Sequence, residues 1–395
     1  MKTVPTESAQ MDKSGVAKSN ELFQRAFDLC VAKTRRNIKD LADHPKTWSN
    51  AVDGRYENFA EGFFEIGNWT SSFFTGMALI AWRETEDEYF LRQTLRLAPA
   101  YREKATVRFL DMHHDAGFLY SLYSVALHKL TKQPEHREVG LAAAEALYQR
   151  FNHKGNFIRA WGHLNTTEQD NMAIIDCMMN LPLLYWAAVE TSNLKFREAA
   201  IQQADTTLKC FIRPDDSVFH AFRFDLKTGK PIGGDNYCGY AVGTHWARGT
   251  GWAIYGFALS YKYTGDTKYL DAASRLALKF ISLLDRELVP VWDFRLPADK
   301  PQLRDSSALA VAVCGLMELA QLGGQDSKFF HSVRPMLLRL CSDEYLNFDP
   351  ACRGVLRNGQ VGANGPGSAQ NAYTSWGDYY LMEALDRELH KGETW

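Results

Sequence analysis

Residues 195–211, KFREAAIQQADTTLKCF, carry the pattern that decides the fold. Apolar residues, among them Phe196, Ala200 and Ala204, recur at helical spacing, and charged residues occupy the opposite face. This pattern is typical of an amphipathic helix that buries one side. Charge-decorated segments of the same kind occur at five other places, near residues 22–41, 89–105, 137–151, 268–285 and 328–342.

A second kind of helix alternates with the first and is apolar nearly all round, which predicts burial on every face. The six segments are 70–83, 117–130, 172–189, 250–264, 306–321 and 375–387. The simplest packing is a ring of six helical hairpins, in which the outer helices shield the inner ones. The sequence therefore predicts an all-α fold, with a single domain over 21–395 and a flexible N-terminal tail over 1–20. Strand signals are sparse and confined to loops, for example SVFHAFRFD at 217–225.

Composition narrows the choice of partners and compartment. A net charge of −2 over 395 residues gives no global field that would favour nucleic acid or an anionic membrane. We find neither an N-terminal apolar signal nor a run of 18 apolar residues, so we expect no membrane association. The 7 cysteines are odd in number and contain no CxxC pair, which favours a reducing, cytoplasmic location. The 11 histidines show no HExxH spacing, and we expect no metal or other cofactor.

The loops that lead into the inner helices should gather on one face of the ring, as binding loops do on other closed scaffolds. These loops contain acids, tryptophans and arginines: Trp69, Asp115, Asp176, Trp246, Arg248, Trp252, Arg304, Asp305, Trp376 and Asp378. Aromatic faces stack on sugars, an arginine fork binds a carboxylate, and carboxyl groups transfer protons. This combination indicates a site for an acidic sugar.

Asp176 is the sharpest candidate for catalysis. It lies in the apolar segment 172–189, and its helical neighbours include no cation. Desolvation without a nearby positive charge should raise its pKa, so that it could hold a proton near neutral pH. The alternative is a buried structural aspartate that bonds to backbone amides.

The other candidates have stronger structural alternatives. Asp115, in HHDAGFLYSLY at 113–123, precedes a helix and could be an N-cap, a catalytic acid or both. Arg248 lies between Trp246 and Trp252 and needs a carboxylate, which either a substrate or a protein acid could supply. Each tryptophan could belong to the core, although three at helix mouths favour at least one sugar platform. His220 is ambiguous, and His113 and His114 are expected to support the site.

Several segments together resemble the unsaturated glucuronyl hydrolases of glycoside hydrolase family 88. They are HHDAGFLYSLY, IIDCMMNLPLLYWA, FHAFRFD, WARGTGWAIYGFAL, VWDFRLP with RDSSALAVAVCGLMELA, and WGDYYLMEAL. The match runs from about Trp69 to Leu385 in the same order. The resemblance implies an (α/α)6 barrel, in agreement with the six hairpins counted above.

The resemblance also implies a reaction and the residues that perform it. Such enzymes remove the 4,5-unsaturated uronic acid that polysaccharide lyases leave at the non-reducing end of oligosaccharides. They hydrate the C4=C5 bond: an aspartate protonates C4, water adds at C5, and the hemiketal opens and releases the aglycone. By motif match, Asp176 is this general acid/base and Asp115 is the second acid. The residues that match the lining of the sugar subsite are Trp69, His220, Trp246, Arg248 and Trp252.

Some positions depart from the family pattern. Cys238 stands where glutamine is common, and WARGTGW at 246–252 leans toward the related unsaturated rhamnogalacturonyl hydrolases. Three alternatives stay open. They are such a rhamnogalacturonyl hydrolase, an inverting glycosidase that uses two carboxyls on saturated substrates, and an inactive sugar-binding protein.

The loop LRNGQVGANGPGSAQNAYTSWGDYY at 356–380 contains no lysine, whereas family members that prefer sulfated disaccharides use serine and lysine there. We therefore expect a preference for non-sulfated substrates.

Overall fold

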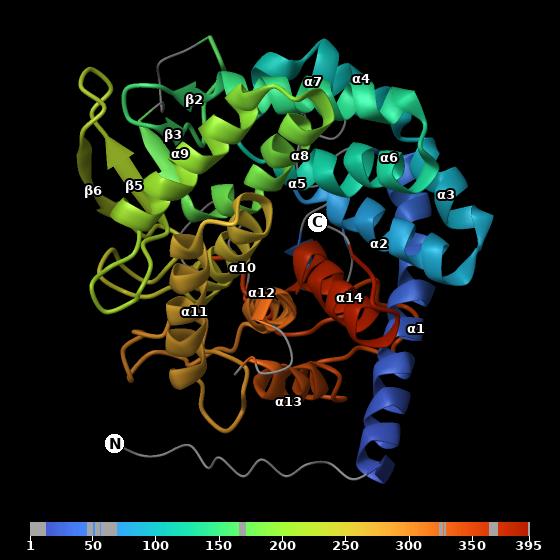
Figure 1. Ribbon diagram of the computed structural model, residues 1–395. Coiled ribbons are helices and arrows are strands. Elements are labelled where there is room, and N and C mark those ends of the chain that lie inside the picture. Colours follow the sequence, from blue (N-terminus) through green and yellow to red (C-terminus); the bar gives the residue numbers. More distant parts are fainter. Residues whose placement is uncertain are drawn as a thin grey trace.

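A computed structural model describes residues 13–45, 50–51, 56, 69–165, 171–323, 327, 329–362 and 370–393. It contains the predicted inner helices, which surround the centre of the molecule (Figure 1). In chain order they are α2 (Ser71–Thr85), α5 (Ala116–Tyr120) with α6 (Ala126–Thr131), α8 (Leu181–Thr191), α10 (Ala247–Thr264), α12 (Ser306–Gly323) and α14 (Ser375–Leu389). A π-helical turn, Ser121–Val125, joins α5 to α6.

The outer helices lie outside this group (Figure 1). They are α1 (Lys13–Asp43), α3 (Glu88–Leu95) with α4 (Ala98–Thr106), α7 (Pro134–Gln149), α9 (Leu194–Cys210), α11 (Thr267–Ser282) and α13 (Phe330–Leu340). Each inner helix packs on the next, and α14 packs on α2, so the inner ring closes. The predicted (α/α)6 barrel is confirmed.

The turns from inner to outer helices share a hydrogen-bonding pattern at a threonine, which the sequence reading missed. Four inner helices end at a threonine whose hydroxyl donates to the carbonyl four residues earlier and accepts from the backbone N–H two residues later. The residue after each threonine has a positive φ, and only one of these four residues is glycine. The threonines are Thr85, Thr131, Thr191 and Thr264, and the positive-φ residues are Glu86, Lys132, Ser192 and Gly265. The hydroxyl satisfies a carbonyl at the helix end, which favours a sharp reversal of the chain.

Two boundaries differ from the predictions. Helix α1 begins at Lys13, so residues 13–20 are helical, while residues 1–12 lie outside the described part of the chain. The segment 172–189 is not one helix: β4 (Met172–Ile174) comes first, then a 3-10 turn (Ile175–Met179), and α8 begins only at Leu181. Pairing of β4 with a distant strand outweighs the local helical pattern there.

Short strands occur in the loops, as predicted. The largest sheet has the order β4-β5-β6 and is antiparallel, with β5 at Ala221–Phe224 and β6 at Pro231–Asp235. Two further sheets each pair two short strands, β2 (Phe151–Asn152) with β3 (Phe157–Ile158) and β1 (Asn50–Ala51) with β7 (Tyr373–Thr374).

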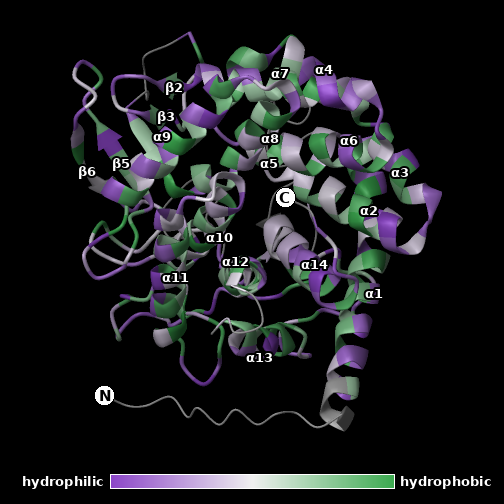
Figure 2. Cartoon of the chain, in the orientation of Figure 1, coloured by the Kyte–Doolittle hydropathy of each residue, from purple (hydrophilic) through white to green (hydrophobic). Residues whose placement is uncertain are grey.

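Hydropathy follows the layers of the barrel: apolar residues predominate on the inner helices and polar residues mark the outer faces (Figure 2). Among the described residues, α12 alone has the length and apolar composition of a membrane span, and 72% of that window is buried inside the structure. Since α12 packs against α10 and α14, its apolar surface is accounted for as an inner helix of the barrel.

Candidate active site

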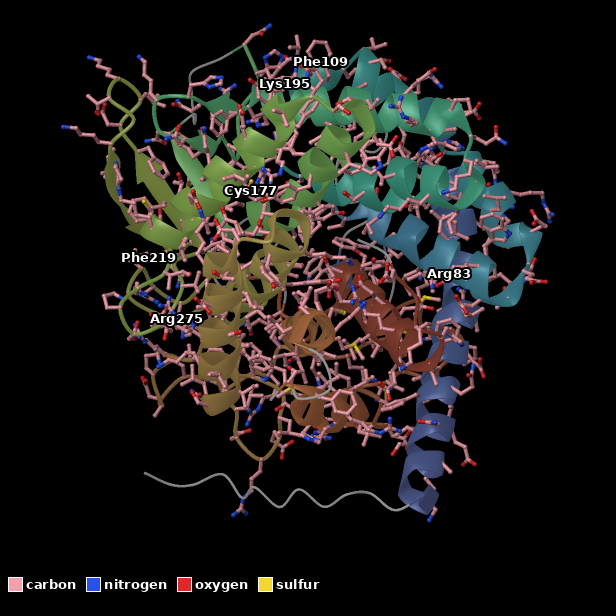
Figure 3. All side chains as sticks on the ribbon, viewed as in Figure 1. Arg83, Phe109, Cys177, Lys195, Phe219 and Arg275 are labelled. Carbon is pink, nitrogen blue, oxygen red and sulfur yellow. The ribbon has the colours of Figure 1, made fainter. Side chains whose placement is uncertain are left out.

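Strand pairing brings His220 to Asp176, although the two are far apart in sequence. In the β4–β5 pair, Ile174 lies opposite Ala221, and the N–H of Ile175 donates to the carbonyl of His220 at 2.8 Å. Asp176 is the second residue of the turn that follows β4, and its Oδ2 lies 3.5 Å from Nε2 of His220. Cys177, its neighbour in this turn, is fully buried, and it is labelled nearer the centre of the view than Lys195 (Figure 3).

The prediction of a raised pKa for Asp176 is wrong. Burial pushes this pKa upward, but contact with His220 outweighs it, so the pKa of Asp176 lies below its usual value. Burial lowers the pKa of His220, and its interactions with Cys238 and Asp176 overcome this effect and raise it to about 9. Near neutral pH the pair is therefore a carboxylate beside an imidazolium. The sequence reading considered only helical neighbours and so missed this cation.

Asp115 is held next to Asp176 by Asn180. The side-chain carbonyl of Asn180 accepts from the N–H of Phe118 at 2.7 Å, and its amide donates to the carbonyl of Asp176 at 3.2 Å. Gly117 permits this close approach, because a Cβ there would lie 2.2 Å from Cα of Asn180. Although Asp115 occupies the N-cap position of α5, its side chain makes no capping bond. Asn180 satisfies the helix end instead, which leaves the Asp115 carboxyl for the site.

The raised pKa belongs to Asp115. Burial and the negative charge of Asp176 raise it to about 8, although Arg150, Lys104 and a hydrogen bond with Asn180 oppose the shift. His114 Nε2 lies 3.3 Å from Oδ1 of Asp115, and burial lowers the pKa of this histidine to about 3, so the imidazole is neutral. Near neutral pH the site thus holds one protonated and one ionised carboxyl, a difference that acid–base catalysis requires.

A continuous series of ring contacts joins the remaining predicted residues. The ring centroid of His220 lies 4.7 Å from that of Trp246, and the guanidinium of Arg248 lies 4.6 Å from the Trp246 ring and 5.1 Å from that of Trp376. The series continues from Trp376 through Trp69 and Phe118 to Trp252, with centroid separations of 4.9, 5.4 and 5.3 Å. The structure therefore brings all seven predicted site residues together.

The tryptophans differ in what they can offer a sugar. Trp69 is partly exposed and stacks on Trp376, so it has a face available as a platform. Trp246 and Trp252 are buried, at 2% and 0% exposure. They can form a wall or donate from the indole N–H, and a stacking role for them stays a prediction.

Arg248 has the protein partner that the sequence reading considered as its alternative. It donates to Asp305 at 3.1 Å, to the carbonyl of Val361 at 2.7 Å and to the carbonyl of Gln360. Asp305 also accepts from the backbone of Ser307 and Gln360. Arg248 therefore fixes the loop at 360–361. Its contact with a substrate carboxylate stays a prediction, for which Nε is the atom without a partner in the described structure.

Six of the buried polar atoms that lack a hydrogen-bond partner in the described structure lie at this site. They are both ring nitrogens of His114, Oδ2 of Asp176, Nε1 of Trp246, Nε of Arg248 and Nε1 of Trp252. Buried polar groups that lack a hydrogen bond are costly, so each calls for an explanation, and a bound ligand is one. Most of these atoms are donors, which suits a ligand rich in oxygen.

Sequence reasoning missed four residues of the site. The first is Asn180, which is described above. The second is Tyr237, whose ring packs on that of His220 with centroids 4.2 Å apart. The Tyr237 hydroxyl accepts a hydrogen bond from Nε1 of the third residue, Trp161, at 3.2 Å. The backbone nitrogen of Cys238 lies 3.4 Å from Nδ1 of His220. Only Cys238 gave a signal, as a departure from the family pattern. Trp161 and Tyr237 lie in loops outside the inner helices, where no periodicity points to them.

Two further features bear on the predictions of metal and sulfate binding. Glu84, Asp386 and His390 have atoms close enough to share an ion, but Arg83 pairs with both acids, which indicates an ion-pair cluster. In the loop at 356–380, the amide of Gln360 donates to Asn371 at 3.2 Å. Residues 363–369 lie outside the described structure, and the preference for non-sulfated substrates stays a prediction.

The sequence model of Glycosyl Hydrolase Family 88 matches residues 41–334. The chain belongs to this family. Unsaturated glucuronyl hydrolase from Bacillus sp. strain GL1 is 34% identical over 378 residues, which cover 94% of this chain and 98% of that protein. Unsaturated chondroitin disaccharide hydrolase from Streptococcus pyogenes serotype M1 is 33% identical over 374 residues, which cover 93% of this chain and 92% of that protein.

The fold is similar as well. The crystal structure of unsaturated glucuronyl hydrolase from Bacillus sp. GL1, described as responsible for the degradation of glycosaminoglycan, superposes with a TM-score of 0.87 at 33% identity. The superposition covers 93% of this chain and 97% of that one. The family 88 chain is thus a glycoside hydrolase built on a helical barrel.

Proposed function

We propose that this family 88 hydrolase removes a 4,5-unsaturated uronic acid from the non-reducing end of lyase-generated oligosaccharides by hydrating the C4=C5 bond. The observation that carries the proposal is the buried pair of acids, in which Asp115 is protonated and Asp176 is ionised near neutral pH. Protonation of an enol ether needs an acid, and addition of water needs a base. The relatives named above act on unsaturated uronyl substrates by name, which supports the same substrate class here.

In this mechanism Asp176 is the general acid/base. It gives a proton to C4, the electron pair of the C4=C5 bond forms the C4–H bond, and the ring oxygen stabilises the positive charge left on C5. Water attacks C5 and loses its proton to the Asp176 carboxylate. The hemiketal then opens, and the aglycone departs from C1.

Because Asp176 is ionised in the unliganded site, it must receive a proton before it can donate one. His220, at 3.5 Å, and Asp115 are both protonated near neutral pH. The carboxylate of a bound uronate adds a negative charge, and a like charge raises the pKa of a neighbouring carboxyl. Substrate binding therefore favours transfer of a proton to Asp176.

The walls of the site suit an anionic sugar. The imidazolium of His220 and the guanidinium of Arg248 both contact the Trp246 ring. Trp69, which is partly exposed and stacks on Trp376, offers an aromatic face. The location we propose is a reducing, cytoplasmic one, and the support for it is that all seven cysteines are free.

The choice of substrate tests this function. We expect turnover of an unsaturated uronyl disaccharide and no detectable turnover of the saturated disaccharide with the same aglycone, because only the former has a double bond to protonate. Aglycone release, followed by chromatography, measures both. Comparable rates on the two substrates would instead support the inverting glycosidase.

The pH profile tests the protonation states. Both Asp115, with a pKa of about 8, and His220, with a pKa of about 9, must keep their protons. We therefore expect kcat/KM to fall as the pH rises through this range and to change little between about pH 6 and pH 7. A profile that stays level up to about pH 10 would contradict the assignment.

A further inference from the structure

Arg150 is a buried cation whose charge acts on Asp115. It follows α7 and has 0% of its surface exposed. Its guanidinium donates to the backbone carbonyls of Met112 at 2.8 Å, Arg159 at 2.7 Å and Gly162 at 3.0 Å, and also to that of Trp161. Four carbonyls of two separate loops therefore meet one side chain.

These two loops carry residues of the site. Met112 stands three residues before Asp115, and the segment 159–162 contains Trp161. The Trp161 ring packs edge-on against His113 and His114, with centroid separations of 5.2 and 5.6 Å. The N–H of His114 donates to the carbonyl of Ala160 at 3.3 Å, which joins the loops a second time.

The charge of Arg150 also reaches the site. It opposes the rise in the pKa of Asp115, and it contributes to the low pKa values of His113 and His114. A guanidinium is always ionised, so this positive charge is fixed at every pH at which the protein is folded. Geometry and charge thus act on the same carboxyl.

We propose that Arg150 is a positioning residue for the hydration reaction: it holds the loops of Asp115 and Trp161 in register through four backbone carbonyls and places a permanent positive charge near Asp115. Arg150 does not touch the substrate in this account. Its effect passes through Asp115, and the inference rests on the proposed function given above.

Arg150→Lys separates the two effects. Lysine keeps the charge but lacks the planar fork that reaches carbonyls on both sides. A misplacement of about 1 Å at a catalytic group can cost on the order of a hundredfold, so we expect kcat/KM to fall by at least about tenfold, mainly through kcat. The alkaline limb should stay at the wild-type pH. Arg150→Gln removes the charge as well, and the limb should then move to higher pH.

Arg387→Lys is the matched control. Arg387 is a buried arginine near the end of α14, bonded to Glu318 at 2.9 Å, Glu383 at 3.2 Å and the Tyr255 hydroxyl at 2.6 Å. Its conservative replacement should lower the thermal midpoint without changing the pH profile or kcat of the folded enzyme. An equal loss of kcat/KM in Arg387→Lys and Arg150→Lys would show that both substitutions act only through the general stability of the protein. This result would overturn the inference.

Gly162→Ala keeps the inference testable if the Arg150 variants do not fold. Gly162 has a φ of +82°, so alanine is strained there and displaces a carbonyl that Arg150 binds. We expect a loss of kcat in a folded protein. Folded Arg150→Lys or Gly162→Ala with kcat/KM within about twofold of wild type would contradict the role of Arg150. Wild-type enzyme that fails to consume an unsaturated disaccharide would overturn the proposed function itself, and this inference with it.

Discussion

Replacement of Asp176 by asparagine is expected to lower kcat by at least about a hundredfold, the lower end of the effect of a general acid. Asparagine has the same shape but can neither give a proton to C4 nor accept one from water. It also leaves the His220 imidazolium without its carboxylate partner at 3.5 Å. The loss of ultraviolet absorbance of an unsaturated disaccharide measures kcat directly.

The control for Asp176→Asn is Asp386→Asn. Asp386 is another buried acid, paired with Arg83 at the far end of α14, and has no contact with the site. Its replacement should cost stability and leave kcat of the folded protein near the wild-type value. A folded Asp176→Asn variant with kcat within about tenfold of wild type would remove Asp176 from the mechanism.

Asp115→Asn should cause a loss of similar size, again at least about a hundredfold in kcat, because the site then lacks the carboxyl that stores a proton near neutral pH. It should also change the pH dependence of stability. The pKa of Asp115 is about 8 in the folded protein, against about 3.9 in an unfolded chain. Between these values the folded state holds a proton that the unfolded state lacks, so the free energy of unfolding falls as the pH rises.

Because asparagine does not titrate, the Asp115→Asn variant should lose this part of the pH dependence and should be no less stable than wild type near pH 8. Urea midpoints at about pH 5 and about pH 8 measure the difference for both proteins. An identical pH dependence in the two would show that Asp115 does not carry the raised pKa. A variant that keeps wild-type kcat would remove Asp115 from the reaction.

The barrel could be predicted because the sequence pattern of each helix is enough to specify that helix. Helical periodicity along residues 195–211 specifies α9, and the uniformly apolar segment near 306–321 specifies α12. Alternation of the two kinds of helix then allows few packings. Asp115 and Asp176 were found for the same reason, since a lone acid in an apolar segment is visible without knowledge of its neighbours.

The protonation states could not be predicted, because they depend on contacts between distant segments. The cation beside Asp176 is His220, which arrives through the β4–β5 pairing. The residue that satisfies the start of α5 is Asn180, whereas the side chain of Asp115, for which a cap was one of the alternatives, makes no capping bond. Together, these two results mean that the carboxyl protonated near neutral pH is Asp115 and not Asp176.

The timing of chromophore loss tests the central claim, hydration of the C4=C5 bond, most directly. With enzyme in excess over an unsaturated disaccharide, a single turnover is followed by ultraviolet absorbance and by quenched samples assayed for the free aglycone. Hydration destroys the double bond before the ring opens, so we predict that absorbance falls no later than the aglycone appears. Aglycone that appears while the absorbance persists would mean direct attack at the anomeric carbon, and would contradict the account.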